Sequence, residues 1–428
     1  MSTITDSLSG NDLRILPMRT PLAILNLMHQ GPKAAVSIGG VVFALLLVFM
    51  QLGFMGAVSY TATNVLEHLR FDAVIRAPDY AHLYEAGAVD RHWLQVARNV
   101  PGVVEAVPLW ITVQNWRKMP TEQEARTMTF EPQYLPIAII GFDAHSSCPL
   151  DLEAIEDQQQ LLRLPSNLLI DTSTHDDYGP WNGKVFSQLD VQQQRTTEVG
   201  SQEFRIAGLF RLGTGLAANG LAVMGQEGFA RLWPLPTDQQ CTLGLLRFTH
   251  TDAQSTDQMV QRIRAKLQSP TFIASVPDAE LPVDILSRER MLANERHRWL
   301  WETPIGLIFQ MGVALSLVVG AAIVYMVLAT DVQNRLPEYA TLLAIGYSRF
   351  YLCRVVLMQA MVLALAGFAA AWLAAEFLYR LVSYLAGIPL HMEPTRIVAV
   401  AVLGTLMCAA SGILALRKLW KAEPASLF

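Results

Sequence analysis

The residue patterns that most often mark catalytic or nucleotide-binding sites are each incomplete in this chain. Gly183-Lys184 is the nearest fragment of a phosphate-binding loop, but it lacks both the GxxxxGK(S/T) spacing and the following hydroxyl. The segment NERHRW, residues 294–299, has the residue types of a zinc peptidase but not the two histidines four positions apart that hold the metal. No GxSxG nucleophile elbow occurs. We therefore expect no catalytic residue, no metal site and no cofactor bound by this chain.

Two weaker polar patterns lie in the middle of the sequence. The run HDD, residues 175–177, fits a turn better than a metal site, because aspartates favour turns. Gly213, Gly215 and Gly220 are scattered among β-forming residues with no helical pattern after them. The helix N-terminus that usually binds a phosphate is therefore not predicted there.

The four cysteines form no CxxC pair and no zinc-ligand spacing. Cys353 and Cys408 lie in apolar runs, where burial as small hydrophobic residues is typical. Cys148 and Cys241 lie in the polar central region. They can form a disulfide if that region is extracytoplasmic, or they can remain free thiols.

Glu376 is an ionisable residue within an apolar run of the C-terminal third. A charge inside a membrane span is costly and by default suggests a functional role. Glu376 lies near one end of its run, however, and Arg380 follows four positions later, which suits an ion pair between successive helical turns. A structural ion pair at the membrane interface and a contact with a substrate both remain open.

Composition separates this chain from soluble proteins and from proteins that bind nucleic acid. Of its 428 residues, 52% are hydrophobic and only 16% are charged, and the mean hydropathy is +0.30. Soluble domains have about 25% charged residues. The net charge of −5 gives no sign of the basic face that nucleic acid requires. We therefore expect part of the chain to lie in lipid and expect no nucleic-acid partner.

Four apolar runs are long enough to cross a bilayer, whose hydrocarbon core needs about 20 apolar residues. We predict transmembrane helices over 36–58, 303–330, 351–382 and 397–416. The first run is longer than the core of a cleaved signal peptide, so we expect a retained anchor. Small residues four positions apart are expected to let helices pack closely in lipid: Gly53 and Ala57 in the first run, and Gly312, Ser316 and Gly320 in the second.

Residues 59–302 are polar enough to fold in water and long enough for one large domain or two small ones. Strand and helix patterns alternate irregularly, which predicts an α+β fold. We divide the region into a subdomain formed by 60–145 with 240–300 and an insertion over 146–239. Strands are expected near 71–77, at the end of 92–113, and near 134–143, 167–173, 243–249 and 271–276, and short strands with a Gly-rich loop over 204–225. Helices are expected at the start of 92–113 and over 256–268.

The distribution of positive charge predicts the orientation of the spans. Arginines and lysines are frequent before the first span, around 331–350 and after the last span, and scarcer around the short loop 383–396. The positive-inside rule therefore places the N-terminal segment 1–35, the loop 331–350 and the tail 417–428 in the cytoplasm. The N-terminal segment contains a predicted amphipathic helix between Thr20 and Gly31.

One cluster, formed by Arg288, Arg290, Arg296 and Arg298, opposes this orientation. We keep the assignment because long domains cross the membrane largely regardless of their charge. The predicted fold class is an α-helical membrane protein with four transmembrane helices and a large α+β extracytoplasmic domain between the first and second. The expected location is the cytoplasmic (inner) membrane, with the large domain in the periplasm.

The loop 331–350 contains PEYATLLAI, residues 337–345, which has the end signals of a short amphipathic helix. Pro337 suits the first turn, and Gly346 suits the position just past the last turn. Glu338 would lie at the positive end of the helix dipole. The alternative is a solvated loop with one helical turn. A helix fixed between two spans is a natural lever for a cytoplasmic motor protein.

The same residues resemble a known family. RLPEYATLLAIGYSRFYL, residues 335–352, is similar to the cytoplasmic loop of FtsX/MacB-type ABC transporter permeases, and the tail at 415–428 resembles their C-terminal signature. Closer similarity is to the DevC branch, the permeases of DevBCA-type exporters. It is carried by VFMQLGF (48–54), ETPIGLIF (302–309), TDVQNRLPEYATLLAIGY (330–347) and MCAASGILALRKL (407–419).

The resemblance implies a homodimeric permease with a MacB-like extracytoplasmic domain, working with a separate ATPase that binds the ATP. It also implies a periplasmic membrane-fusion adaptor, a TolC-like outer-membrane duct and a lipid or glycolipid cargo. Carried over to this sequence, the ATPase-facing helix would be 337–345, with Glu338, Tyr339 and Leu342 as contacts and Gly346 as its end.

Three other functions remain as alternatives. An FtsX-like regulator of a cell-wall hydrolase would have a much smaller external domain than 59–302. A lipoprotein-releasing permease would share the four spans but carry a different cargo. A membrane-anchored enzyme would need a catalytic site in 59–302, where none is predicted.

Overall fold

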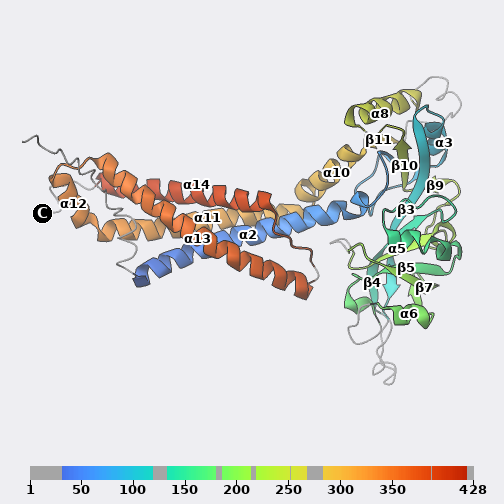
Figure 1. Ribbon diagram of the computed structural model, residues 1–428, viewed down its shortest axis with the longest axis horizontal. Helices are drawn as coiled ribbons and strands as arrows, with labels where there is room; N and C mark the ends of the chain where they lie inside the picture. Colours follow the sequence, from blue (N-terminus) through green and yellow to red (C-terminus); the bar gives the residue numbers. More distant parts are fainter. Residues whose placement is uncertain are drawn as a thin grey trace, which may run out of the picture. The chain divides into compact units, whose positions relative to one another are not determined.

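The computed structural model describes residues 31–118, 133–179, 186–213, 218–250, 252–267, 283–386 and 388–421 (Figure 1). The strand predicted at 271–276 lies outside these residues, as does the helix predicted between Thr20 and Gly31, except for Gly31 itself. The chain divides into two compact units. One comprises Met1–Met50, Gly312–Phe377 and Met392–Phe428, and the other comprises Gln51–Met311 and Leu378–His391.

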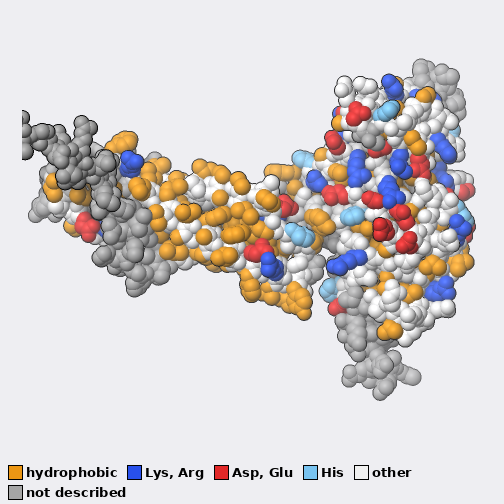
Figure 2. Space-filling model, in the orientation of Figure 1, with side chains coloured by type: hydrophobic (Ala, Val, Ile, Leu, Met, Phe, Trp, Pro, Cys, Tyr) orange, Lys and Arg blue, Asp and Glu red, His pale blue; other side chains and the backbone are white. Residues whose placement is uncertain are grey.

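Four long helices have the length and composition of membrane spans. They are α2 (Gly31–Glu67), α11 (Pro304–Asn334), α13 (Arg349–Ala386) and α14 (Pro394–Lys421). Their apolar segments run over Ile38–Glu67, Pro304–Asn334, Phe350–Leu385 and Pro394–Ala415, and each is long enough for a bilayer core that needs about 20 residues. Apolar side chains cover the visible surface of these helices in Figure 2. The predicted four-helix membrane part is confirmed.

Small residues allow close helix contacts in the first unit. A Cβ atom added at Gly320 of α11 would lie 2.7 Å from Met407 Sδ and 2.8 Å from Ala44 Cβ, so α11 meets α14 and α2 there. Ser316 is buried, and its hydroxyl donates to Gly312 O at 2.7 Å. The small-residue stripe of α11 therefore faces neighbouring helices of the same chain at Ser316 and Gly320.

A further close approach joins α2 and α13 in the second unit. A Cβ atom added at Gly53 would lie 2.5 Å from Tyr379 Oη. Ala57, one turn further along α2, is buried. Glu376 and Arg380 lie on consecutive turns of α13, and the ion pair between them stays a prediction.

The second unit is built on a nine-stranded mixed sheet with the strand order β11-β1-β10-β3-β4-β8-β5-β7-β6. The pairs β4–β8 and β5–β7 are parallel, and the other neighbouring pairs are antiparallel. The strands are β1 (Ala73–Arg76), β3 (Val103–Arg117), β4 (Tyr134–Phe142), β5 (Asn167–Asp171), β6 (Thr196–Val199), β7 (Gln202–Phe210), β8 (Leu221–Gly225), β10 (Leu243–Phe248) and β11 (Asp284–Ser287). A separate two-stranded sheet pairs β2 (Val89–Asp90) with β9 (Gln240–Cys241).

Strands from both predicted subdivisions share the large sheet. Those of 60–145 and 240–300 form one side, and those of 146–239 continue it through the pairing of β4 with β8. The division into a subdomain and an insertion stays a prediction, since the sheet itself runs through the boundary. The α+β character of the domain is confirmed.

Helices cover both faces of this sheet. The longer ones are α3 (His92–Arg98), α8 (Ala253–Leu267) and α10 (Arg288–His297), followed by η3 (Arg298–Glu302), a π-helical turn. Short turns are α5 (Glu153–Glu156), η1 (Gln159–Arg163), η2 (Asp176–Tyr178), α6 (Gln188–Gln192) and α7 (Gln226–Phe229). Alternate strand residues point to opposite faces, so Leu109 and Ile111 lie in one apolar core and Trp110 lies in the other.

The first core also receives the end of α2. Val65 and Leu66 are buried in it, which is why α2 continues to Glu67, past the predicted end of the span at residue 58. Cys148 belongs to this core and Cys241 to the other, and both are free thiols. Burial raises the pKa of the Cys241 thiol to about 12, as expected for a cysteine with a packing role.

Candidate coupling site

The segment between α11 and α13 forms the predicted short helix, α12 (Leu336–Ala344). Arg335 links α12 to α11: at the end of α11 its N–H donates to Asp331 O at 3.2 Å, and at the start of α12 its carbonyl accepts from Tyr339 N at 3.0 Å. Pro337 lies in the first turn, where its missing N–H would have no helical acceptor. α12 is therefore joined to α11 through hydrogen-bonded turns.

The other end of α12 is a defined stop. Gly346 has a φ of +104°, a conformation that glycine adopts without the penalty of a Cβ atom. Tyr347 N donates to Leu342 O at 3.0 Å, which satisfies a carbonyl of the last turn. Ser348 then caps α13, because its hydroxyl accepts from Tyr351 N at 3.3 Å. α13 thus starts from a cap of its own.

Tyr339 holds α12 against the neighbouring helices. Its side chain is 3% exposed and belongs to a cluster with Val332 of α11 and with Leu352 and Val356 of α13. The phenol Oη is buried and has no hydrogen-bond partner among the described residues. Burial, with a further contribution from the charge of Asp331, raises the pKa of Tyr339 to about 12.

We expect Tyr339→Phe to leave α12 as stable as it is or to stabilise it, because a buried hydroxyl without a partner is unfavourable. Tyr339→Ala instead removes the ring and leaves a cavity, at a cost of about 3–5 kcal/mol. Hydrogen exchange of the α12 amides in the full chain measures both effects. Protection should be unchanged or higher in the phenylalanine variant and lower by about a hundredfold or more in the alanine variant. Lower protection in Tyr339→Phe would show that the hydroxyl has a partner.

A charged network ties the same three helices together. The Arg335 side chain is 7% exposed and lies 3.2 Å from Asp331 Oδ1 and 3.6 Å from Glu338 Oε2. Gln359 of α13 donates to the second oxygen of Asp331. A buried guanidinium requires such partners, because desolvating an unpaired charge is very costly. The network fixes the start of α12 relative to α11 and α13.

The three residues predicted to contact the ATPase differ in their exposure. Glu338 is exposed, Leu342 is half-buried, and Tyr339 is buried, so Tyr339 packs inward and Glu338 faces solvent. Pro337 and Gly346 are exposed at the two ends of the helix. The contact of these residues with an ATPase stays a prediction. The sequence analysis did not single out three large apolar side chains beside them: Ile345, Tyr347 and Phe350 are 70%, 47% and 87% exposed.

A second group of contacts lies where α10 leads into α11. The Thr303 hydroxyl donates to Trp299 O at 2.7 Å and accepts from Gly306 N at 3.2 Å. A Cβ atom added at Gly306 would lie 2.3 Å from Leu300 O and 2.4 Å from Trp299 O, both of them backbone atoms. The π-helical turn and α11 therefore form a tight joint that requires glycine at this position.

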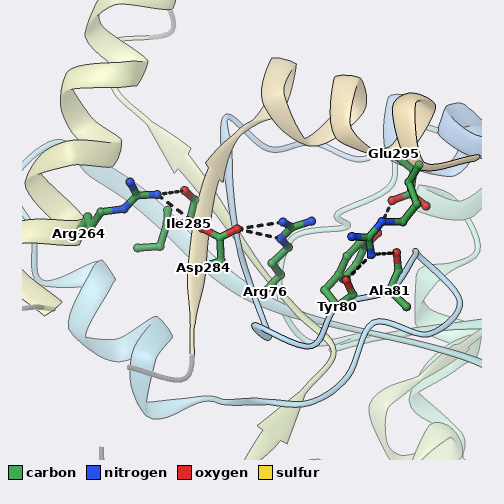
Figure 3. A network of polar contacts seen from close by, with 8 residues as sticks. Arg76, Tyr80, Ala81, Arg264, Asp284, Ile285 and Glu295 are labelled. Atoms are coloured by element: carbon green, nitrogen blue, oxygen red, sulfur yellow. Dashed lines mark hydrogen bonds and ion pairs between the residues drawn. The ribbon is translucent and has the colours of Figure 1, made fainter. Parts of the chain in front are cut away.

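Glu295 is the central acceptor of this second group (Figure 3). Glu295 is only 1% exposed. Its carboxylate accepts three hydrogen bonds: from Tyr80 Oη at 2.8 Å, from Leu83 N at 3.0 Å and from Trp299 Nε1 at 3.1 Å. Burial and the neighbouring Glu295 raise the pKa of Tyr80 well above its usual value. We call Glu295 and its three donors the α10 clamp.

Arginines extend the attachment of α10 on both sides of the α10 clamp. Arg288 donates to Glu67 O and Leu69 O, both at 2.6 Å, and Arg296 donates to Glu67 Oε1 at 2.6 Å. Arg298 donates to Tyr80 O at 2.6 Å and also to Ala81 O; Figure 3 labels these two acceptor residues. The end of α2 and the loop after β1 are thus both held to the helical segment formed by α10 and η3.

The edge strand β11 is fixed just before α10. Asp284 Oδ2 accepts from Arg76 of β1 at 3.0 and 3.2 Å, and Ile285 O accepts from Arg264 of α8 at 3.0 Å (Figure 3). On the α2 side, Asn64 Nδ2 donates to Leu212 O at 3.1 Å. Both connections between the spans and the sheet are therefore anchored by side chains.

These contacts explain the arginine cluster that opposed the predicted orientation. Arg288, Arg296 and Arg298 are used within the domain, and Arg290 pairs with Asp257 of α8 at 3.3 Å. The segment 294–299, whose residue types resemble a zinc site, supplies the α10 clamp instead. No group of three metal-ligating side chains occurs among the residues that the structure describes.

The described residues define a membrane protein with four spans and one large α+β domain between the first two. Residues 311–424 match the family described as FtsX-like permease C-terminal, a stretch that includes α12, α13 and α14. This C-terminal stretch of the chain is similar to an FtsX-like permease domain.

Two solved structures are similar to the chain at low identity. The extracellular domain of YknZ, a noncanonic ABC-type transporter from Gram-positive bacteria, is 10% identical, with a TM-score of 0.32 and coverage of 51% of this chain and 100% of that chain. The periplasmic region of MacB from Actinobacillus actinomycetemcomitans is 7% identical, with a TM-score of 0.31 and coverage of 54% and 94%. No curated protein matches the chain by sequence.

Proposed function

We propose that this chain is the permease subunit of an ABC exporter of the FtsX/MacB type, driven by a separate ATPase. The observation that carries the proposal is the match of 311–424 to the FtsX-like permease family. Two further features support it: the sequence has no phosphate-binding loop of its own, and α12 presents Glu338 and part of Leu342 outward. In this proposal α12 binds the ATPase, Pro337 and Gly346 set its ends, and Tyr339 holds it from behind.

The proposed mechanism transmits movement from α12 to the large domain. α12 is joined to α11 through the backbone hydrogen bonds of Arg335, and α11 begins at the tight joint of Thr303 and Gly306. Beyond that joint, the α10 clamp connects the helix to the loop after β1. A displacement of α11 driven by ATP hydrolysis would therefore reach the sheet through α10, since packed elements move as rigid bodies.

The remaining parts of the assembly follow from the resemblance of the sequence to DevC-type permeases. They are a second copy of the chain, a periplasmic membrane-fusion adaptor, a TolC-like duct and a lipid or glycolipid cargo. The large domain lies outside the cytoplasm and both termini lie inside, in agreement with the positive charges around 331–350.

Purification of the full-length tagged chain from its native membranes tests this proposal. An ABC ATPase should co-purify with it, and the complex should hydrolyse ATP in a vanadate-sensitive manner. The chain stripped of its partner should have no such activity. Recovery of a cell-wall hydrolase without an adaptor would favour the regulatory alternative. Hydrolytic activity of the chain alone would favour an enzyme and contradict the proposal.

A further inference from the structure

A cavity of about 330 Å³ lies among α2, α13 and α14 within the membrane unit. Its lining includes Leu45 of α2, Ala364 and Leu365 of α13, and Gly404 and Thr405 of α14. Leu45 and Ala364 are 1% and 5% exposed, whereas Leu365 is 72% exposed. The cavity therefore extends from the outer surface of the helices to the interface between them, as a groove in the side of this unit.

Small residues create the groove. Gly404 lies so close to α2 that an added Cβ atom would be 2.7 Å from Leu45 Cδ2. Ala364 and Ala401 line the recess where larger apolar side chains would fill it. The groove is thus a consequence of residue size at the contacts of three helices.

Its depth along the helices places the groove in the hydrocarbon core. The α14 span runs over Pro394–Ala415, which is 22 residues, and Gly404 is the eleventh of them. At 1.5 Å per residue, Gly404 lies about 15 Å from either end of that span. This is the middle of a hydrocarbon layer that is about 30 Å thick, and lipid headgroups do not reach it.

The chemistry of the lining determines what fills the groove. Thr405 is the one residue with a polar side chain among the residues that line it, whereas a bound water needs two to four polar partners. An empty groove would leave its lining atoms without dispersion contacts. A whole helix, about 10 Å across, is too wide to enter a recess of this volume. What remains is a flexible apolar chain.

We propose that this groove binds the distal part of one acyl chain of a bilayer phospholipid. The headgroup remains at the membrane surface, and the end of the chain lies against Ala364, Ala401 and Gly404. Such a lipid would complete the packing among α2, α13 and α14. The proposal is independent of the ATPase and of the transported cargo.

Photolabelling in defined vesicles tests the proposal. The full-length protein is placed in vesicles of phosphatidylethanolamine and phosphatidylglycerol that contain a phosphatidylethanolamine with a diazirine near the end of one acyl chain. After illumination, mass spectrometry maps the labelled residues. Labelling should concentrate at Leu365 and its neighbours in the groove, above that of Val318 of α11, which is 66% exposed but lies outside it.

Filling the groove should remove this labelling. Ala364→Leu is expected to lower labelling at the groove about tenfold, the factor that corresponds to 1.4 kcal/mol of binding. Ala401→Leu should fill the groove from the α14 side. It replaces Ala364→Leu in the labelling experiment if that variant does not fold. Ala366→Leu is the matched control, because Ala366 is exposed on the same helix and does not line the groove; it should leave labelling unchanged.

Several outcomes would overturn the proposal. One is even labelling of all exposed apolar residues, and another is labelling that both filling variants leave unchanged. Labelling that appears only after a cell lipid extract is added would assign the groove to a cargo lipid. An unlabelled groove together with disulfide-linked copies of a Leu365→Cys variant would assign it to a side chain of a second copy.

Discussion

Leu342→Pro is expected to abolish ATPase binding while leaving the four spans inserted in the membrane. Leu342 lies inside a helix of nine residues. Proline there removes a backbone donor and clashes with the carbonyl four positions earlier, at a cost of about 3 kcal/mol. So short a helix cannot absorb that cost, because isolated helices of this length are marginal in water. The outward positions of Glu338 and Thr341 would be lost together with the helix.

The measurement is the amount of ATPase that co-purifies with the tagged full-length chain. We expect less than about one tenth of the wild-type amount, since the binding free energy should fall by well over 1.4 kcal/mol. Leu342→Met is the matched control, because methionine at the same position preserves both helicity and side-chain volume. Resistance to carbonate extraction reports that the variant remains inserted. ATPase recovery at the wild-type level in Leu342→Pro would rule out α12 as the docking element.

Local signals in the sequence were sufficient to predict the membrane part and α12. An apolar run specifies a span by its length alone, and Pro337 and Gly346 mark the ends of α12 through their own backbone preferences. The sequence did not predict which side of α12 faces outward. Tyr339 is buried because Val332, Leu352 and Val356 come from two other helices, and this arrangement is a tertiary property.

In the α+β domain, still more of the structure depends on tertiary contacts that the sequence could not predict. β11 has only four residues, and its pairing with β1 joins segments more than two hundred positions apart. Two of the donors to Glu295, Tyr80 and Leu83, are also distant from it in sequence. The residues around Glu295 therefore showed only an incomplete zinc motif and not its role as an acceptor. One signal was present: four arginines lie close to a span, on the side that the positive-inside rule predicts to be poor in positive charge, and such charges are expected to have partners.

Glu295→Ala is expected to detach α10 from the loop after β1 without affecting ATPase binding at α12. The change removes the acceptor of three hydrogen bonds and leaves Tyr80 Oη, Leu83 N and Trp299 Nε1 buried without it. Each unsatisfied buried donor costs about 1–3 kcal/mol. Because such costs are not additive, we expect the free energy of local opening at the α10 clamp to fall by about 3 kcal/mol in total.

Hydrogen exchange of the purified complex measures this effect at two places. In the wild type, ATP with vanadate should change exchange both at α12 and in β1 and β11. In Glu295→Ala, the change at α12 should persist, the change in the strands should disappear, and the amides around Leu83 should exchange about a hundredfold faster. Loss of the response at α12 as well would contradict the separation of the two sites.

Two matched variants show whether the acceptor geometry is responsible. Glu295→Gln keeps the shape of the side chain and one acceptor oxygen, which can accept from Leu83 N and Trp299 Nε1. Its amide NH₂ can donate to Tyr80 Oη. We therefore expect the free energy of local opening at the α10 clamp to fall by only about 1 kcal/mol. Arg290→Gln changes the same helix at an exposed ion pair with Asp257, side chains that are 55% and 51% exposed, where pairs contribute about 0–1 kcal/mol. Movement should therefore reach the sheet in Arg290→Gln, reach it in part in Glu295→Gln, and stop at α10 in Glu295→Ala. An unchanged response in all three variants would mean that α10 transmits movement by packing alone.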